Sequence, residues 1–125
     1  MPHTILIADD NKAIRTGLRN LFEHEGDFDV CGEAENGREA VEKAQQLHPD
    51  LILLDLSMPI MNGLEAAGLL KKIMAKVPVI IYSAHQDSMS KQEADSAGIW
   101  AWISKSENAS VLLKEARGLI HSTAS

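Results

Sequence analysis

The chain has 125 residues, of which 45% are hydrophobic and 24% charged, a composition that excludes a disordered protein and suits a single domain over residues 1–125. A formal net charge of −6 argues against direct nucleic-acid binding by this chain, because affinity for a polyanion comes from Lys and Arg. Cys31 is the only cysteine, so no disulfide can form within the chain, and no stretch approaches the ~20 apolar residues of a membrane span. We therefore expect a soluble, cytoplasmic domain with no membrane contact.

Apolar stretches typical of strands alternate along the chain with stretches that have the periodicity of amphipathic helices. The expected strands are Thr4–Ala8, Phe28–Ala34, Leu51–Leu54, Val77–Tyr82 and Ile99–Ile103. The helical patterns between and after them end near Gly26, before Pro49, at about Met74, at Ala97 (for a weak pattern over Ser88–Ala97) and at Ile120. Residues 121–125 are expected to form a frayed tail or the start of a linker. The alternation predicts an α/β fold with a doubly wound, five-stranded parallel sheet and helices on both faces.

The stretch LILLDLSMPIMNG, from Leu51 to Gly63, is the most informative part of the chain. Its apolar run indicates a strand buried on both faces that ends at Asp55, at the sheet edge where open α/β folds place their chemistry. Pro59 disfavours helical angles at the residue before it, which predicts a loop before the next helix. Asn62 is the expected N-cap of that helix, and Glu65 is its capping-box partner.

Polar side chains stand at the carboxyl ends of four expected strands, namely Asp9, Asp10, Asp55, Ser83 and Lys105. Taken singly, each has an ordinary structural explanation as a helix cap, a turn residue or a surface lysine. At one sheet edge, however, three crowded carboxylates raise the pKa of at least one of them unless a cation is present. Mg²⁺ suits such a cluster and leaves room for a phosphate, and a lysine and a hydroxyl add donors for phosphoryl oxygens. The chemistry predicted is phosphoryl transfer to a carboxylate.

The sequence resembles the receiver domain of bacterial two-component response regulators over essentially its whole length. The resemblance lies in ILIADDN, GEAENGREAVE, PDLILLDLSMPIMNGLEA, PVIIYSA and AGIWAWISK. It implies a flavodoxin-like, three-layer (βα)5 fold with strand order 2-1-3-4-5, in which the first and third strands are neighbours. It also implies a phosphorylation-dependent signalling switch rather than an enzyme with an external substrate, relaying a signal to an output domain or partner, most often for transcription regulation.

The resemblance assigns roles to the acidic residues. Asp55 is implied to accept a phosphoryl group from a sensor histidine kinase. Asp10, Asp55 and the main-chain carbonyl of Ser57 are implied to bind Mg²⁺ directly, and Asp9 to help through water. Mn²⁺ is expected to substitute for Mg²⁺.

The resemblance also assigns roles to the residues that read the phosphoryl group. Ser83 and Lys105 are implied to contact its oxygens, and Trp102 occupies the switch position that is usually Tyr or Phe. Trp100 and Trp102 are two residues apart, so we expect them to share one face of the last strand. The fourth helix, fifth strand and fifth helix are then the expected output face, with Trp100 as a contact and Trp102 as the moving part.

Two features of the sequence indicate which class of response regulator it resembles most. Trp100 and Ala101 stand before Trp102 where regulators with winged-helix outputs carry an acidic pair, so their salt-bridged dimer is not predicted, and a dimer on activation remains one alternative. The run Gly32–Ala34 and the sequence around Asp55 look more like the class with a helix-turn-helix output domain. The chain is then either a domain cut at its linker or a stand-alone receiver.

Two other classes also place an acidic or phosphate-binding site at such a sheet edge. A haloacid dehalogenase-type phosphohydrolase would carry Asp-x-Asp after the first strand, whereas Asp9 and Asp10 are adjacent. A flavodoxin-like electron carrier would need a Ser, Thr or Gly-rich loop there, and the same two acids would repel its phosphate. Visible absorbance from a bound flavin distinguishes the last alternative.

Overall fold

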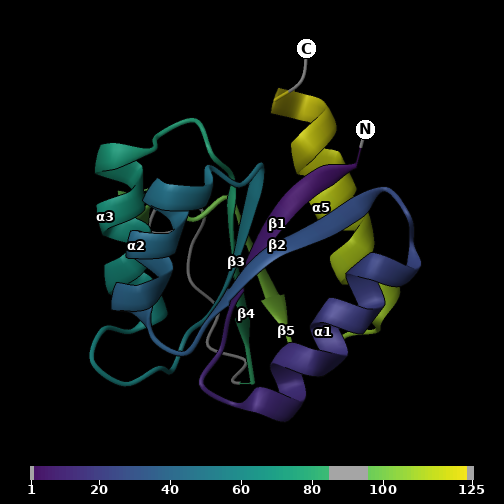
Figure 1. Cartoon of the computed structure of the whole chain (residues 1–125), viewed down its shortest axis with the longest axis horizontal. Helices are drawn as coiled ribbons and strands as arrows, with labels where there is room; N and C mark the ends of the chain where they lie inside the picture. Colours follow the sequence, from purple (N-terminus) through teal and green to yellow (C-terminus); the bar gives the residue numbers. More distant parts are fainter. Residues whose placement is uncertain (1, 85–95, 124–125) are drawn as a thin grey trace.

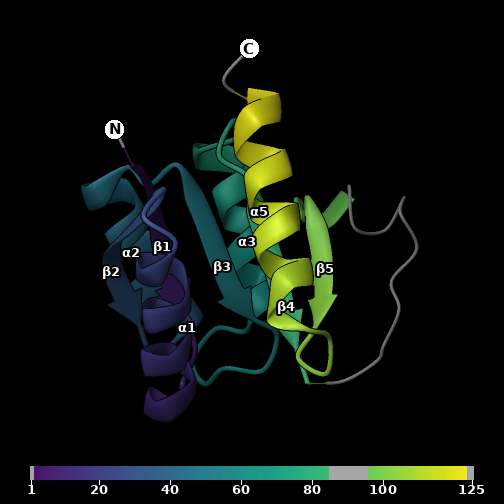
Figure 2. The same cartoon turned by 90° about the vertical axis from the view of Figure 1, so that its right-hand side faces the viewer.

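The computed structural model describes residues 2–84 and 96–123 and has three layers, with a parallel sheet between two pairs of helices (Figure 1). The described elements are β1 (His3–Ala8), α1 (Lys12–His24), β2 (Phe28–Ala34), α2 (Gly37–Leu47), β3 (Leu51–Asp55), α3 (Gly63–Ile73), β4 (Val79–Ser83), β5 (Ala101–Ser104) and α5 (Ala109–Thr123). The strand order is β2-β1-β3-β4-β5 and all pairings are parallel. Helices α2 and α3 cover one face and α1 and α5 the other, with β5 at one edge (Figure 2). The predicted fold class and strand order are confirmed.

Each of the five expected strands is present within two residues of its predicted bounds, and the last strand shows the main difference. β5 begins at Ala101 rather than Ile99, so Trp100 precedes the strand, and the prediction that both tryptophans lie on it is wrong for Trp100. The Trp100 N–H still donates to the Val79 carbonyl at 2.8 Å. The last helix continues to Thr123, past the expected start of a frayed tail. The helix expected at residues 88–97 lies largely outside the described residues.

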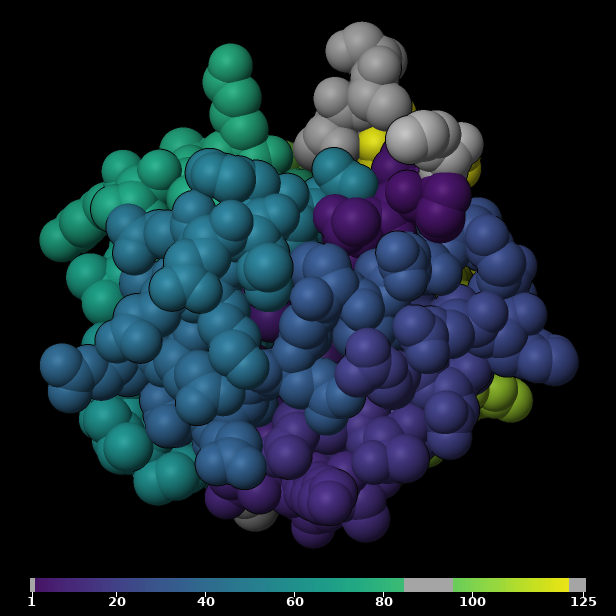
Figure 3. Space-filling view, viewed as in Figure 1, coloured from purple at the N-terminus to yellow at the C-terminus, as the bar shows by residue number. Residues whose placement is uncertain are grey.

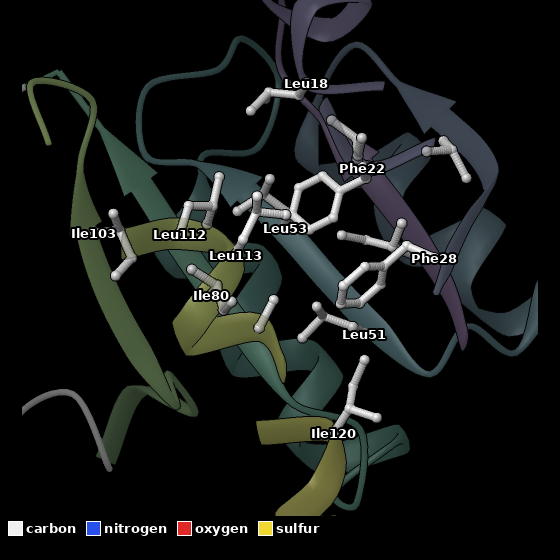
Figure 4. Close-up of a cluster of buried hydrophobic side chains, with 14 residues drawn as sticks. Leu18, Phe22, Phe28, Leu51, Leu53, Ile80, Ile103, Leu112, Leu113 and Ile120 are labelled. Carbon is white, nitrogen blue, oxygen red and sulfur yellow. The ribbon is translucent and has the colours of Figure 1, made fainter. Parts of the chain in front are cut away.

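The core has two halves because the sheet is covered on both faces. All five residues of β3 are buried, and alternate side chains point to opposite faces. Leu51 and Leu53 pack with the α1 and α5 cluster, and Ile52 and Leu54 pack with the α2 and α3 cluster. Figure 4 shows the first of these clusters. The central strand is therefore fixed from both sides, and Asp55 at its end is fixed with it.

Aromatic packing closes the end of the first cluster opposite the carboxyl edge of β3. The rings of Phe22 and Phe28 meet edge to face, with centroids 5.0 Å apart and an interplanar angle of 83° (Figure 4). This arrangement places the positive edge of one ring against the negative face of the other. It ties α1 to the start of β2, so the first helix is packed along its length rather than only near the site.

The loop between β3 and α3 is clamped at both ends. Asn62 caps α3, and the reciprocal bonds with Glu65 form the predicted capping box. The Gly37 N–H, at the start of α2, donates to the Met61 carbonyl at 2.8 Å, and the Gly63 N–H donates to the Leu56 carbonyl at 2.9 Å. A Cβ at position 37 would lie 2.3 Å from the Met61 carbonyl oxygen. Only glycine allows this approach, which holds the loop over the sheet edge.

Candidate functional site

Three carboxylates meet at the carboxyl edge of the sheet. Ala8 pairs with Leu54, so Asp9 and Asp10 after β1 stand beside Asp55 at the end of β3. One oxygen of each carboxylate lies within 4.8 Å of the others. Asp9 is 1% and Asp55 7% exposed, whereas Asp10 is exposed to solvent. The structure thus brings together the acidic residues singled out from the sequence.

Lys105 supplies the positive charge between these carboxylates. Its Nζ lies 3.0 Å from Asp9 Oδ2 and 3.2 Å from Asp55 Oδ1. The same Nζ lies 5.8 Å from the centroid of the Tyr82 ring, within reach of a cation–π contact. Its main-chain N–H donates to the Ser83 carbonyl at 2.7 Å, which joins the ends of β4 and β5. Lys105 therefore links the end of β5 to the ends of three other strands, β1, β3 and β4.

An open pocket of about 240 Å³ lies over this cluster. It is lined by Asp9, Asp10, Asn11, Ile14, Asp55, Ser57, Ser83, Ala84 and Lys105. Ser83 is 1% exposed and lies at the carboxyl end of β4. The pocket has room for several waters, and hence for a small hydrated ion with a phosphoryl-sized group. Trp102 does not line it, and Trp100 is 40% exposed elsewhere on the surface.

Residues 5–117 match the response regulator receiver domain family. The chain belongs to this family. The family function is a phosphorylation-dependent signalling switch in two-component systems. Among the described residues, no helix of this receiver domain is long and apolar enough to cross a membrane.

Relatives with curated names support the same family. The response regulator protein VraR of Staphylococcus saprophyticus is 34% identical over 117 residues, which are 94% of this chain and 56% of VraR. A protein-glutamate methylesterase/protein-glutamine glutaminase of Paramagnetospirillum magneticum is 44% identical over 97 residues, which are 76% of this chain and 26% of that protein. The receiver domain thus spans about half of VraR and about a quarter of the methylesterase.

Solved structures agree with the fold. The crystal structure of a LuxR-family two-component response regulator from Aurantimonas sp. has a TM-score of 0.91 and 25% identity, covering 98% of this chain and 87% of that chain. This LuxR-family neighbour and the response regulator VraR are consistent with the class that has a helix-turn-helix output domain.

The oxygen donors in the receiver pocket fit a divalent cation. Both carboxylate oxygens of Asp9 already have partners, because Oδ1 accepts the Asn11 N–H at 2.8 Å and Oδ2 accepts Lys105. Asp10 is exposed and Asp55 pairs through Oδ1 with Lys105. Three carboxylates opposite one lysine leave an excess of negative charge, and hard oxygen donors suit Mg²⁺.

The electrostatics of Asp55 follow from the same excess of charge. Burial raises the pKa of Asp55, and the neighbouring Asp9 raises it further, against the opposing effect of Lys105. Burial lowers the pKa of Lys105, but its hydrogen bond with Asp9 and its attraction to both carboxylates outweigh this, so the net shift is upward. The site therefore holds Asp55 in an environment that favours an added cation.

Two contacts in the site were not expected from the sequence. Tyr82 lies beneath Lys105, and Arg15 reaches back from α1 to donate to the Asp9 carbonyl at 2.7 Å. Arg15 has the local pattern of a solvated helix residue but is 7% exposed. The Tyr82 contact depends on the pairing of β4 with β5, and the Arg15 contact depends on the packing of α1 against the strand ends.

We predict that Asp55→Asn stabilises the metal-free receiver at pH 7, because the raised pKa of Asp55 means that its charge opposes folding. A carboxyl group with a raised folded pKa stabilises the native state below its unfolded pKa, and this contribution is lost as the pH rises through the folded pKa. The stability advantage of Asp55→Asn over the parent should therefore grow between about pH 4 and pH 7. Urea denaturation with a chelator measures it.

The matched control for this experiment is Asp29→Asn, since Asp29 is exposed on β2 and belongs to no carboxylate cluster that the structure describes. Its stability difference from the parent gives the effect of removing an exposed carboxylate outside the site. If the Asp55→Asn advantage does not grow with pH beyond that reference, the proposed electrostatics of Asp55 are wrong.

Proposed function

We propose that Asp55 is the phosphoacceptor of this receiver, that it takes a phosphoryl group from a phosphohistidine of a sensor histidine kinase, and that it passes the signal to an output domain or partner. The observation that carries the proposal is the meeting of Asp9, Asp10, Asp55 and Lys105 in one open pocket. Asp55 is the one carboxylate there that ends a strand buried on both faces. The proposal includes no external substrate, so the chain acts as a switch rather than as an enzyme.

The proposed chemistry needs a nucleophile and charge compensation. An Asp55 oxygen attacks phosphorus, the O–P bond forms, and the N–P bond to the histidine breaks, with the electron pair returning to the imidazole nitrogen, which takes up a proton. Lys105, already 3.2 Å from Asp55, offsets charge on the phosphoryl oxygens. Ser83 at the end of β4 offers its hydroxyl as a donor to the same oxygens.

The proposed metal site uses Asp10, Asp55 and the Ser57 carbonyl as direct ligands, with Asp9 acting through water. The support lies in the contacts of Asp9, whose two carboxylate oxygens are already held by Asn11 and Lys105. Asp10 is exposed to solvent and lines the pocket together with Ser57. Mg²⁺, or Mn²⁺ in its place, would neutralise charge on the acceptor and the transferring group.

The proposed output face comprises the fourth helix, which lies largely outside the described residues, together with β5 and α5. Trp102 on β5 pairs with Ile81, two residues before Ser83, and is partly buried against the α2 and α3 cluster. Trp100 is 40% exposed and suits a contact with a partner. Lys105 and Trp102 are separated by two residues, so a shift at the pocket is carried directly into β5.

We predict that acetyl phosphate and Mg²⁺ add one phosphoryl group to the parent protein and none to Asp55→Asn, because the nucleophilic carboxylate is lost. Intact mass spectrometry measures the addition. Asp29→Asn keeps the pocket intact and should be labelled like the parent. Equal labelling of Asp55→Asn and the parent would show that another residue is the acceptor.

We predict that Mg²⁺ affinity falls more in Asp10→Asn than in Asp9→Asn, because a direct ligand contributes more than one that acts through water. A titration with MgCl₂ followed by amide chemical shifts measures both dissociation constants. Equal affinities in the two variants would contradict the proposed coordination.

We predict that beryllofluoride, a mimic of the phosphoryl group, changes the emission of Trp102 in a Trp100→Phe background, where Trp102 is the sole tryptophan. The change should be smaller after Ser83→Ala, because the hydroxyl that links the phosphoryl group to β4 is gone. Unchanged emission and quencher access with Asp55 occupied would remove Trp102 from the switch and leave the phosphoacceptor assignment standing.

A further inference from the structure

Arg15 connects the acidic loop after β1 to the edge strand β2. Its Nη1 donates to the main-chain carbonyl of Asp9 at 2.7 Å, and its Nε donates to Glu33 Oε1 at 3.1 Å. The side chain is 9% exposed, so the guanidinium is largely removed from water. A desolvated guanidinium with two directed hydrogen bonds is held in one orientation.

The bond from Arg15 completes the fixation of Asp9. The Asp9 N–H donates to the Ala34 carbonyl at 3.0 Å, and its carboxylate accepts Asn11 and Lys105. With its carbonyl bound to Arg15, all the polar groups of Asp9 have partners. That carbonyl belongs to the peptide unit that joins Asp9 to Asp10. Arg15 therefore fixes the orientation of the Asp9–Asp10 peptide plane, and with it the starting direction of the Asp10 side chain.

Glu33 orients the Arg15 guanidinium and has three basic partners of its own. Its carboxylate accepts Arg15 and also Arg19 from the next turn of α1, and its main-chain carbonyl accepts Lys43 from α2. Burial raises the pKa of Glu33, but the two arginines outweigh burial and lower it, so the carboxylate stays charged. Glu33 lies on β2, which is at the front of the molecule in Figure 1. In the same view, Figure 3 shows the segment that contains β2 and α2 at the middle of the surface.

We propose that Arg15 is a positioning residue for the divalent cation site, which it serves by holding the Asp9–Asp10 peptide so that the Asp10 carboxylate faces the pocket. The inference rests on the proposed function, because it takes Asp10 as a ligand. It adds a residue that touches neither the metal nor the phosphoryl group. Removing a partner that orients a metal ligand typically weakens metal affinity about 10- to 100-fold.

Arg19 is the matched control because it shares Glu33 with Arg15, and among the described residues its hydrogen bonds and ion pairs do not include Asp9. Its Nη1 binds Glu33 and its Nη2 reaches the Val30 carbonyl at 3.4 Å. Arg15→Gln removes the bond to the Asp9 carbonyl together with the charge. Arg15→Lys keeps the charge, but a single ammonium lacks the fork that reaches Glu33 and the Asp9 carbonyl together.

The test is a titration of the whole chain with MgCl₂, followed by amide chemical shifts, on the parent, Arg15→Gln, Arg15→Lys and Arg19→Gln. We expect the Mg²⁺ dissociation constant to rise about tenfold in both Arg15 variants. It should change less than about twofold in Arg19→Gln, whose charge loss is similar. In the metal-free protein, the carbonyl ¹³C shift of Asp9 should move in the Arg15 variants and stay in place in Arg19→Gln.

The outcomes separate this inference from the function on which it rests. If the parent binds Mg²⁺ through Asp10 and the Arg15 variants match Arg19→Gln, the positioning role is overturned and the phosphoacceptor site stands. A parent that does not bind Mg²⁺ at all overturns both. Should Arg15→Gln fail to fold, Arg15→Lys decides the matter, since it keeps a charge beside Glu33. Full affinity in folded Arg15→Lys would show that charge alone, and not the directed bond, is what the site needs, which also overturns the inference.

Discussion

Parallel pairing of β1 with β3 forces like charges together, and the remaining features of the site compensate for this. The register that joins Ala8 to Leu54 brings Asp9, Asp10 and Asp55 within 4.8 Å of one another. Both strands are almost fully buried, so the carboxylates cannot separate without moving the core. Apolar burial along the two strands supplies the free energy that holds this unfavourable arrangement. Lys105, whose Nζ lies 3.0 Å from Asp9 and 3.2 Å from Asp55, therefore contributes to the fold as well as to the site.

The sequence predicted the features of the structure that depend on residues close together in the chain. The apolar run before Asp55 and the capping box of Asn62 with Glu65 each lie within a few positions and appear where expected. The strand order came from the family resemblance, since periodicity alone does not choose neighbours. The start of β5 was predicted two residues early because Ile99 is apolar and only 2% exposed, like a strand residue, although the strand begins at Ala101.

Contacts between distant parts of the chain left no such signal. Arg15 binds the Asp9 carbonyl six residues away and Glu33 eighteen residues away. Lys105 meets Asp9 across 96 positions. Each residue has an ordinary local pattern, so the Arg15 contact in particular required the packing of α1 against β1 and β2. Sequence reasoning singled out the carboxylates and the lysine that meet at the sheet edge, and it missed Arg15, which binds the Asp9 carbonyl.

The contacts divide the site into a fixed half and a responsive half. On the β1 and β2 side, Asp9 is bound through its backbone and its carboxylate, and the Arg15 side chain is buried against a half-buried Glu33. On the β4 and β5 side, Lys105 divides one charge between two carboxylates. In the proposed reaction Asp55 exchanges a single negative charge for a phosphoryl group with greater charge, which draws Lys105 away from Asp9. Asp9 keeps its place because Arg15 and the Ala34 carbonyl hold its backbone, so the displacement passes into the strand that carries Trp102.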